Sequence, residues 1–135
     1  MHSGGIPLCF PQFGPPGKVP QQHGFARNLD WEVCSSSADV NPDYPEPSVL
    51  LKLSASEYTR KLYPYEFEAT LEVTLRRDRL KLELSVINRD NQPIDFTAAL
   101  HTYIEVLFKF LPSMERTKIT LNSYAKTAGD RRLRH

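Results

Sequence analysis

The most constraining feature of this sequence is the alternation of apolar and polar residues between positions 67 and 86. Apolar side chains occupy every second position in two successive runs, Phe67 to Leu75 and Leu80 to Val86. Successive side chains of a strand point to opposite faces, so each run predicts a strand with one buried and one solvated face. The charged residues 76–79 between them predict the turn of an antiparallel hairpin.

Other segments are expected to join this hairpin in an all-β fold. Leu50 to Leu53 predicts a short strand, and Ile94 to about Val106 predicts a last strand after the turn at 88–93. No amphipathic helix is expected. Eight of the 11 prolines and five of the six glycines lie within residues 1–47, which predicts a loop-rich N-terminal part. Short strands separated by turns indicate a β-sandwich or barrel.

Composition and charge exclude several classes of protein. A chain of 135 residues with 40% hydrophobic and 24% charged side chains is typical of one globular domain. No apolar stretch is long enough to span a membrane. Residues 116–135 are strongly basic and could contact nucleic acid or anionic lipid. We favour a solvated terminus, because no aromatic platform accompanies the charge, and we expect neither a nucleic-acid nor a membrane partner.

One loop gathers the side chains that a polar ligand needs. Residues 22–28, Gln-His-Gly-Phe-Ala-Arg-Asn, hold an amide, an imidazole and a guanidinium, with Gly24 to let backbone approach a ligand. Trp31, the only tryptophan, follows and could cover the apolar face of a sugar. Arg27 could bind an anion. The alternative, in which His23 and Arg27 merely tie the loop to the sheet, is equally compatible with these residues.

His101 belongs to the polar face of the expected last strand, together with Thr97 and Tyr103. By spacing alone a surface or structurally satisfied histidine is the commoner outcome. The four histidines show no ligand spacing, and the two cysteines show no Cys-x-x-Cys motif, so no metal site is expected.

Three motifs in order resemble the glucose-6-phosphate 1-epimerase family, the hexose-6-phosphate mutarotases related to aldose 1-epimerases, in its plant-type form. The motifs are residues 4–14 (GGIPLCFPQFG), residues 22–27 (QHGFAR) and residues 99–103 (ALHTY). The resemblance covers about residues 4 to 104. It implies a galactose-mutarotase-like β-sandwich and the interconversion of the α and β anomers of a hexose 6-phosphate, with no metal or organic cofactor.

The resemblance also implies roles for individual residues. His101 aligns with the general acid, and His23 aligns with a histidine that holds the sugar and polarises its ring oxygen. Gln22 and Arg27 would contact the substrate, and Arg27 is a candidate for its phosphate. Members usually carry an arginine before the Gly-Gly-Ile-Pro run, where this chain has Ser3.

We expect the chain to be an incomplete sandwich: residues 1–106 a partial mutarotase-like domain, and residues 107–135 a divergent basic C-terminal tail. The family's general base is a glutamate beyond the third motif, and we expect it to be missing here, so whether the chain is an active isomerase stays open. A non-catalytic sugar-phosphate binding module is the alternative. The expected compartment is the cytoplasm, or a plastid for a full-length form, and oligomeric state cannot be predicted.

Overall fold

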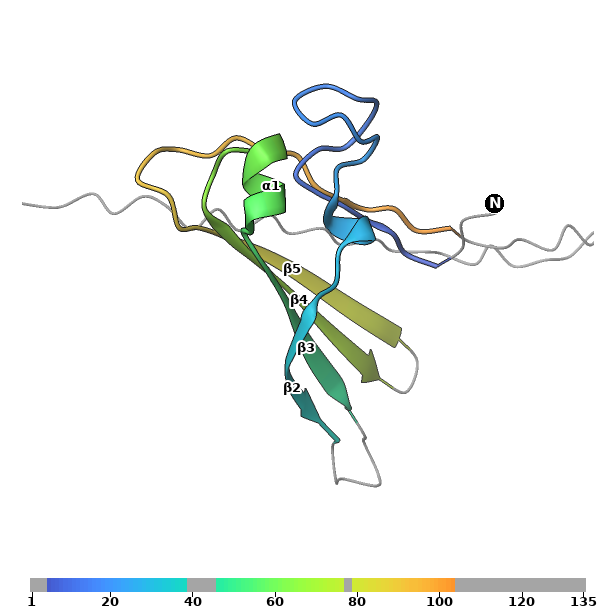
Figure 1. Cartoon of the computed structure of the whole chain (residues 1–135). Coiled ribbons are helices and arrows are strands. Elements are labelled where there is room, and N and C mark those ends of the chain that lie inside the picture. The colour runs from blue at the N-terminus through green and yellow to red at the C-terminus, as the bar shows by residue number, and fades with distance from the viewer. Residues whose placement is uncertain (1–4, 39–45, 77–78, 104–135) are drawn as a thin grey trace, which may run out of the picture.

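The computed structural model describes residues 5–38, 46–76 and 79–103. The elements in chain order are β1 (Leu8–Cys9), the 3-10 helix η1 (Ala26–Asn28), β2 (Glu32–Ser37), β3 (Ser48–Ser54), α1 (Glu57–Leu62), β4 (Phe67–Arg76), β5 (Arg79–Asn88) and β6 (Ala99–Leu100). Four strands form an antiparallel sheet in the order β2-β3-β4-β5, and β1 pairs with β6 in a second, two-stranded sheet (Figure 1). The all-β fold class is therefore confirmed.

The predicted hairpin is formed by β4 and β5. Their register runs from the pair Phe67–Asn88 to the pair Arg76–Arg79, and the predicted turn residues 77–78 lie outside the described residues. The same register extends into β3, where Leu51 lies beside Leu71 and Leu71 lies beside Leu84. Apolar side chains of neighbouring strands thus share one face of the sheet, because opposite residues in a ladder point to the same side.

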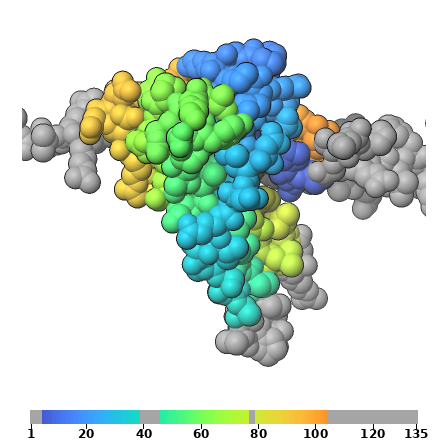
Figure 2. Space-filling model, in the orientation of Figure 1, coloured from blue at the N-terminus to red at the C-terminus, as the bar shows by residue number. Residues whose placement is uncertain are grey.

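The core lies at one end of this sheet. Phe67 and Ala69 of β4 are buried there, whereas Leu75 and Leu80 near the turn are 56% and 49% exposed. Phe10 is fully buried, and its ring lies 5.1 Å from that of Phe67, centroid to centroid. In Figures 1 and 2 the N-terminal loop and α1 gather at this end, and the opposite ends of β2, β3, β4 and β5 extend away from them. Burial is thus concentrated where the N-terminal segment meets the sheet.

A short helix was not expected from the sequence. The α1 helix begins after Ser56, whose hydroxyl accepts a hydrogen bond from the Thr59 amide while the Thr59 hydroxyl accepts one from the Ser56 amide. This reciprocal cap satisfies donors that a helix N-terminus otherwise leaves unpaired. Glu57 and Lys61 form an ion pair one turn apart. Six residues are too few to display a helical period, which explains why the pattern gave no signal.

The expected last strand is much shorter than predicted. Within residues 94–103 only Ala99–Leu100 is strand, so the prediction is wrong for residues 94–98 and 101–103. The segment still follows the N-terminal segment: the Thr97 amide donates to the Pro11 carbonyl at 3.0 Å, and the His101 amide donates to the Pro7 carbonyl at 2.9 Å. Proline has no N–H to return, which explains why these contacts do not extend the ladder. Positions 104–106 lie outside the described residues.

Two further expectations concern the basic tail and membrane-spanning segments. The basic tail, residues 107–135, lies outside them, so the boundary after residue 106 stays a prediction. Within the described residues, no helix is long and apolar enough to cross a membrane.

Candidate functional site

Three segments that are distant in the sequence meet beside β1 and β6. The pairs Leu8–Leu100 and Cys9–Ala99 join the N-terminal segment to the segment that ends in His101. On its other side, Phe10 bridges Gly24 of the QHGFAR loop, and the Ala26 amide donates to the Phe10 carbonyl at 3.1 Å. The N-terminal segment therefore lies between the two segments that carry the predicted site histidines.

This arrangement brings His23 and His101 together. Their imidazole rings lie 5.4 Å apart, centroid to centroid, in an edge-to-face orientation. Phe13 is 5.2 Å from the ring of His23 and 6.1 Å from that of His101, and Tyr103 stacks on His101 at 4.8 Å. We call Phe13, His23, His101 and Tyr103 the ring cluster. It combines two groups that can transfer protons with two aromatic surfaces.

The backbone at His23 and Gly24 is in the left-handed region, with φ of 65° and 72°. A Cβ atom at position 24 would lie 2.2 Å from the Phe10 carbonyl oxygen. Glycine is therefore needed here because the Phe10 backbone approaches closely, and not, as expected from the sequence, to admit a ligand. The close approach fixes the position of the loop from which His23 projects.

The His23 side chain is held in a defined protonation state. Its Nδ1 accepts a hydrogen bond from the Gly14 amide at 3.1 Å, so in this arrangement Nδ1 carries no proton and the neutral ring carries its proton on Nε2. Desolvation, followed by the charges of Arg27 and His101, lowers the pKa of His23 from its ordinary value. A neutral His23 with an Nε2–H donor is the form that these surroundings favour.

Gln22 and Arg27 flank His23 in the same loop, and both are exposed. The Arg27 guanidinium donates to the Gln22 carbonyl at 2.9 Å, which ties η1 to the start of the loop. A guanidinium has five N–H donors, so this contact leaves donors for an anionic oxygen. The structure thus shows the loop-tying role for Arg27 and leaves the binding roles of both side chains as predictions.

Trp31, in contrast, which the sequence offered as an aromatic surface, is half-buried. Its indole N–H donates to the Ala26 carbonyl at 2.9 Å, and its ring packs against the core. Phe13 and Tyr103, 51% and 49% exposed, offer aromatic surface beside the histidines instead. Tyr103 could have been identified from the sequence, because alternation places it on the same side as His101. Phe13 belongs to the first motif, but its proline- and glycine-rich stretch shows no periodicity that would place its ring beside the histidines.

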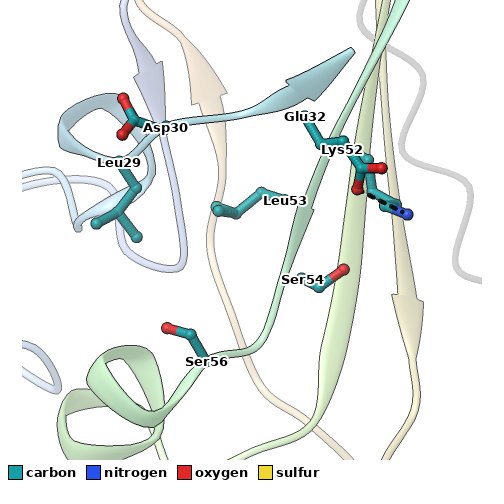
Figure 3. A pocket seen from close by; sticks show the side chains of 7 residues that line it. All are labelled: Leu29, Asp30, Glu32, Lys52, Leu53, Ser54 and Ser56. Carbon is teal, nitrogen blue, oxygen red and sulfur yellow. Dashed lines mark ion pairs between the residues drawn. The ribbon is translucent and has the colours of Figure 1, made fainter. Parts of the chain in front are cut away.

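An open pocket of about 260 Å³ lies elsewhere, between the start of β2, the end of β3 and the cap of α1 (Figure 3). An ion pair of 3.0 Å between Lys52 and Glu32 crosses its rim. Its lining is Leu29, Asp30, Glu32, Lys52, Leu53, Ser54 and Ser56, which includes no member of the ring cluster. Among the described parts of the chain there is no group of three or more His, Cys, Asp or Glu side chains that could hold a metal ion.

This sheet-rich fold, with its two histidine motifs side by side, resembles those of the mutarotase class. The family model described as aldose 1-epimerase matches residues 2–133, and the chain belongs to this family. It is 39% identical over 108 residues to the "Putative glucose-6-phosphate 1-epimerase" of Cenchrus ciliaris, and 33% identical over 105 residues to the protein of the same name from Escherichia coli. Each alignment covers 76% of this chain and 32% of the relative, so the chain spans about a third of these relatives' length.

Two crystal structures support the same fold. The "putative mutarotase (YeaD)" of Salmonella typhimurium is 31% identical, with a TM-score of 0.53 over 61% of this chain and 26% of that one. The Slr1438 protein of Synechocystis is 30% identical, with a TM-score of 0.56 over 65% of this chain and 32% of that one. The predicted galactose-mutarotase-like fold is therefore confirmed for part of the chain.

Proposed function

We propose that this chain binds a hexose 6-phosphate and interconverts its α and β anomers. The observation that carries the proposal is the 5.4 Å separation of His23 and His101, which places two imidazoles from different segments at one site. The family to which the chain belongs is named for the epimerisation of aldoses. The relatives' names support a sugar 6-phosphate as the substrate. The exposed guanidinium of Arg27, in the same loop as His23, supports it too.

The reaction opens and recloses the sugar ring. A base takes the proton of the anomeric hydroxyl while an acid protonates the ring oxygen, which breaks the bond between that oxygen and C1. His101 is the acid in this proposal, because an imidazole can give and regain a proton near neutral pH. His23, neutral and with a proton on Nε2, donates a hydrogen bond that polarises the ring oxygen.

The remaining assignments concern binding. Gln22 contacts sugar hydroxyls through its amide, which can both donate and accept hydrogen bonds. Arg27 binds phosphate oxygens, to which a planar guanidinium can donate two parallel hydrogen bonds. The base that the resemblance implies is a glutamate later in the family's chains, and we assign it to no residue here.

A non-catalytic sugar-phosphate binding module is the second candidate. The same observation favours it, because the imidazoles of His23 and His101 can bind a sugar even where no base completes the reaction. Exchange NMR between the two anomeric signals of glucose 6-phosphate separates the candidates. Exchange faster than in buffer supports a mutarotase, and saturable binding without faster exchange supports the binding module. Absence of both would contradict the two candidates together.

A further inference from the structure

A series of hydrogen bonds connects Thr97, in the segment before β6, to the imidazole of His23 through the N-terminal segment. Thr97 makes two contacts with the N-terminal segment: its Oγ1 accepts from the Phe13 amide at 2.8 Å, and its amide donates to the Pro11 carbonyl at 3.0 Å. Gly14, which follows Phe13 in the chain, donates its amide hydrogen to His23 Nδ1 at 3.1 Å. The His23 amide in turn donates to the Gly14 carbonyl at 2.9 Å.

The direction of the Gly14 amide depends on what holds residues 11–13. Gly14 has a φ of 110°, and glycine is the residue that resists backbone rotation least. Nothing lies within 4 Å of where its Cβ would be, so no neighbour restricts Gly14 from that side. Within this loop the Gln12 side chain donates to the Pro15 carbonyl and accepts from the Val19 amide. The two Thr97 hydrogen bonds tie the backbone of residues 11–13 to the segment before β6, and with it the amide that faces His23.

We propose that Thr97 is a positioning residue which, through Phe13 and Gly14, keeps the proton of His23 on Nε2 and the Phe13 ring against both imidazoles. This inference rests on the proposed function for its purpose, since a fixed Nε2–H is what a sugar ring oxygen requires. The hydrogen-bond relay and the tautomer can nevertheless be measured without substrate. Arg27 and His101 are the charged or titratable groups that act on His23, and both oppose an imidazolium.

The test is heteronuclear NMR of the imidazole nitrogens in the full chain. We compare the wild type with Thr97→Val, which keeps the shape of the side chain and removes the acceptor oxygen. Thr97→Ser restores that oxygen, and Thr74→Val makes the same change at a distance, in β4. In the wild type, His23 Nδ1 should resonate as an unprotonated nitrogen and Nε2 as a protonated one. In Thr97→Val the Nδ1 signal should shift toward that of a protonated nitrogen, and the pKa of His23 should rise toward the ordinary value.

Thr97→Ser and Thr74→Val should keep the wild-type tautomer and pKa. The proposal is overturned if Thr97→Val retains both, if Thr97→Ser behaves like Thr97→Val, or if Thr74→Val has the same effect. A measurement on the wild type covers the case in which Thr97→Val does not fold. Protonation of Nδ1 must break the hydrogen bond from Gly14, so the Gly14 amide shift should titrate with the His23 pKa. An amide shift that does not follow that titration would also overturn the relay.

These readouts separate the inference from the proposed function. A chain with the predicted tautomer but no faster anomer exchange would keep the relay and reject the mutarotase proposal. A chain with exchange but an unaffected tautomer in Thr97→Val would do the reverse.

Discussion

The imidazoles of His23 and His101 lie edge to face at 5.4 Å, although one projects from the QHGFAR loop and the other follows β6. Neither segment positions the other directly. Each is tied to the N-terminal segment between them, through the Phe10–Gly24 bridge on one side and the Leu8–Leu100 pair on the other. The conformation of that segment therefore decides whether the two histidines form one site.

Replacing Gly24 should separate the histidines and destabilise the fold. In Gly24→Ala the new Cβ would lie 2.2 Å from the Phe10 carbonyl oxygen, at a φ of 72°. The left-handed conformation costs an alanine roughly 1–2 kcal/mol, and forced displacement of packed backbone adds about 1–3 kcal/mol. Urea unfolding should show that the free energy of unfolding falls by about the sum of these two contributions.

A matched control isolates the steric part of this effect. Gly5 has a φ of 80°, but nothing lies within 4 Å of its Cβ position. In Gly5→Ala the free energy of unfolding should therefore fall only by the cost of the left-handed conformation, roughly 1–2 kcal/mol. Equal losses in the two variants would contradict the close approach of Phe10 to Gly24.

Arg27 should discriminate between phosphorylated and free sugars. Loss of a hydrogen bond to a charged group costs about 1.5–3 kcal/mol, so Arg27→Ala should weaken glucose 6-phosphate binding roughly tenfold to a hundredfold. Glucose binding should change far less in isothermal titration. Arg60→Ala is the control, because Arg60 pairs with Glu66 beside α1. Equal weakening of both sugars by Arg27→Ala would show that the residue only braces the loop through Gln22.

The stability of the chain should depend on pH through His23. Its folded-state pKa is lowered, by desolvation and by Arg27 and His101, from the ordinary value of 6.5. The unfolded chain therefore binds a proton more readily between the two pKa values. Stability from this group is present above about pH 6.5 and is lost as pH falls toward the folded-state pKa.

The variant His23→Asn should remove this contribution, and asparagine tolerates the positive φ of 65° at this position. Urea unfolding at a series of pH values should then show a flatter dependence between pH 6.5 and the folded-state pKa than in the wild type. An identical dependence in both proteins would assign the effect to other groups.

Much of the fold could be predicted because its pattern is local. The alternation in residues 67–86 predicts β4, β5 and their antiparallel pairing, and the register confirms it. The α1 helix was missed because its cap, Ser56 with Thr59, stabilises a helix too short to show a period. The strand predicted from Ile94 was too long because the prolines opposite it supply carbonyls and no amide hydrogens.

The site was predictable only in part, because it depends on contacts between segments that are distant in the sequence. Motifs identify His23 and His101, but their distance depends on pairing with a third segment, which spacing along the chain cannot reveal. The close approach at Gly24 and the contribution of Phe13 arise from the same pairing. Trp31 was a reasonable candidate for a sugar-covering ring, but its indole N–H is used within the loop.

The most direct test of the account is the rate of anomer exchange of glucose 6-phosphate, measured by exchange NMR with the 135-residue chain, with His101→Asn and with buffer alone. We expect exchange faster than in buffer for the wild type. In His101→Asn that acceleration should fall by on the order of 10²–10⁴-fold, with an unchanged circular dichroism spectrum, because the acid is gone while the sheet remains. Acceleration retained in His101→Asn would remove the catalytic role of this histidine, and a folded wild type with no acceleration would contradict the mutarotase proposal itself.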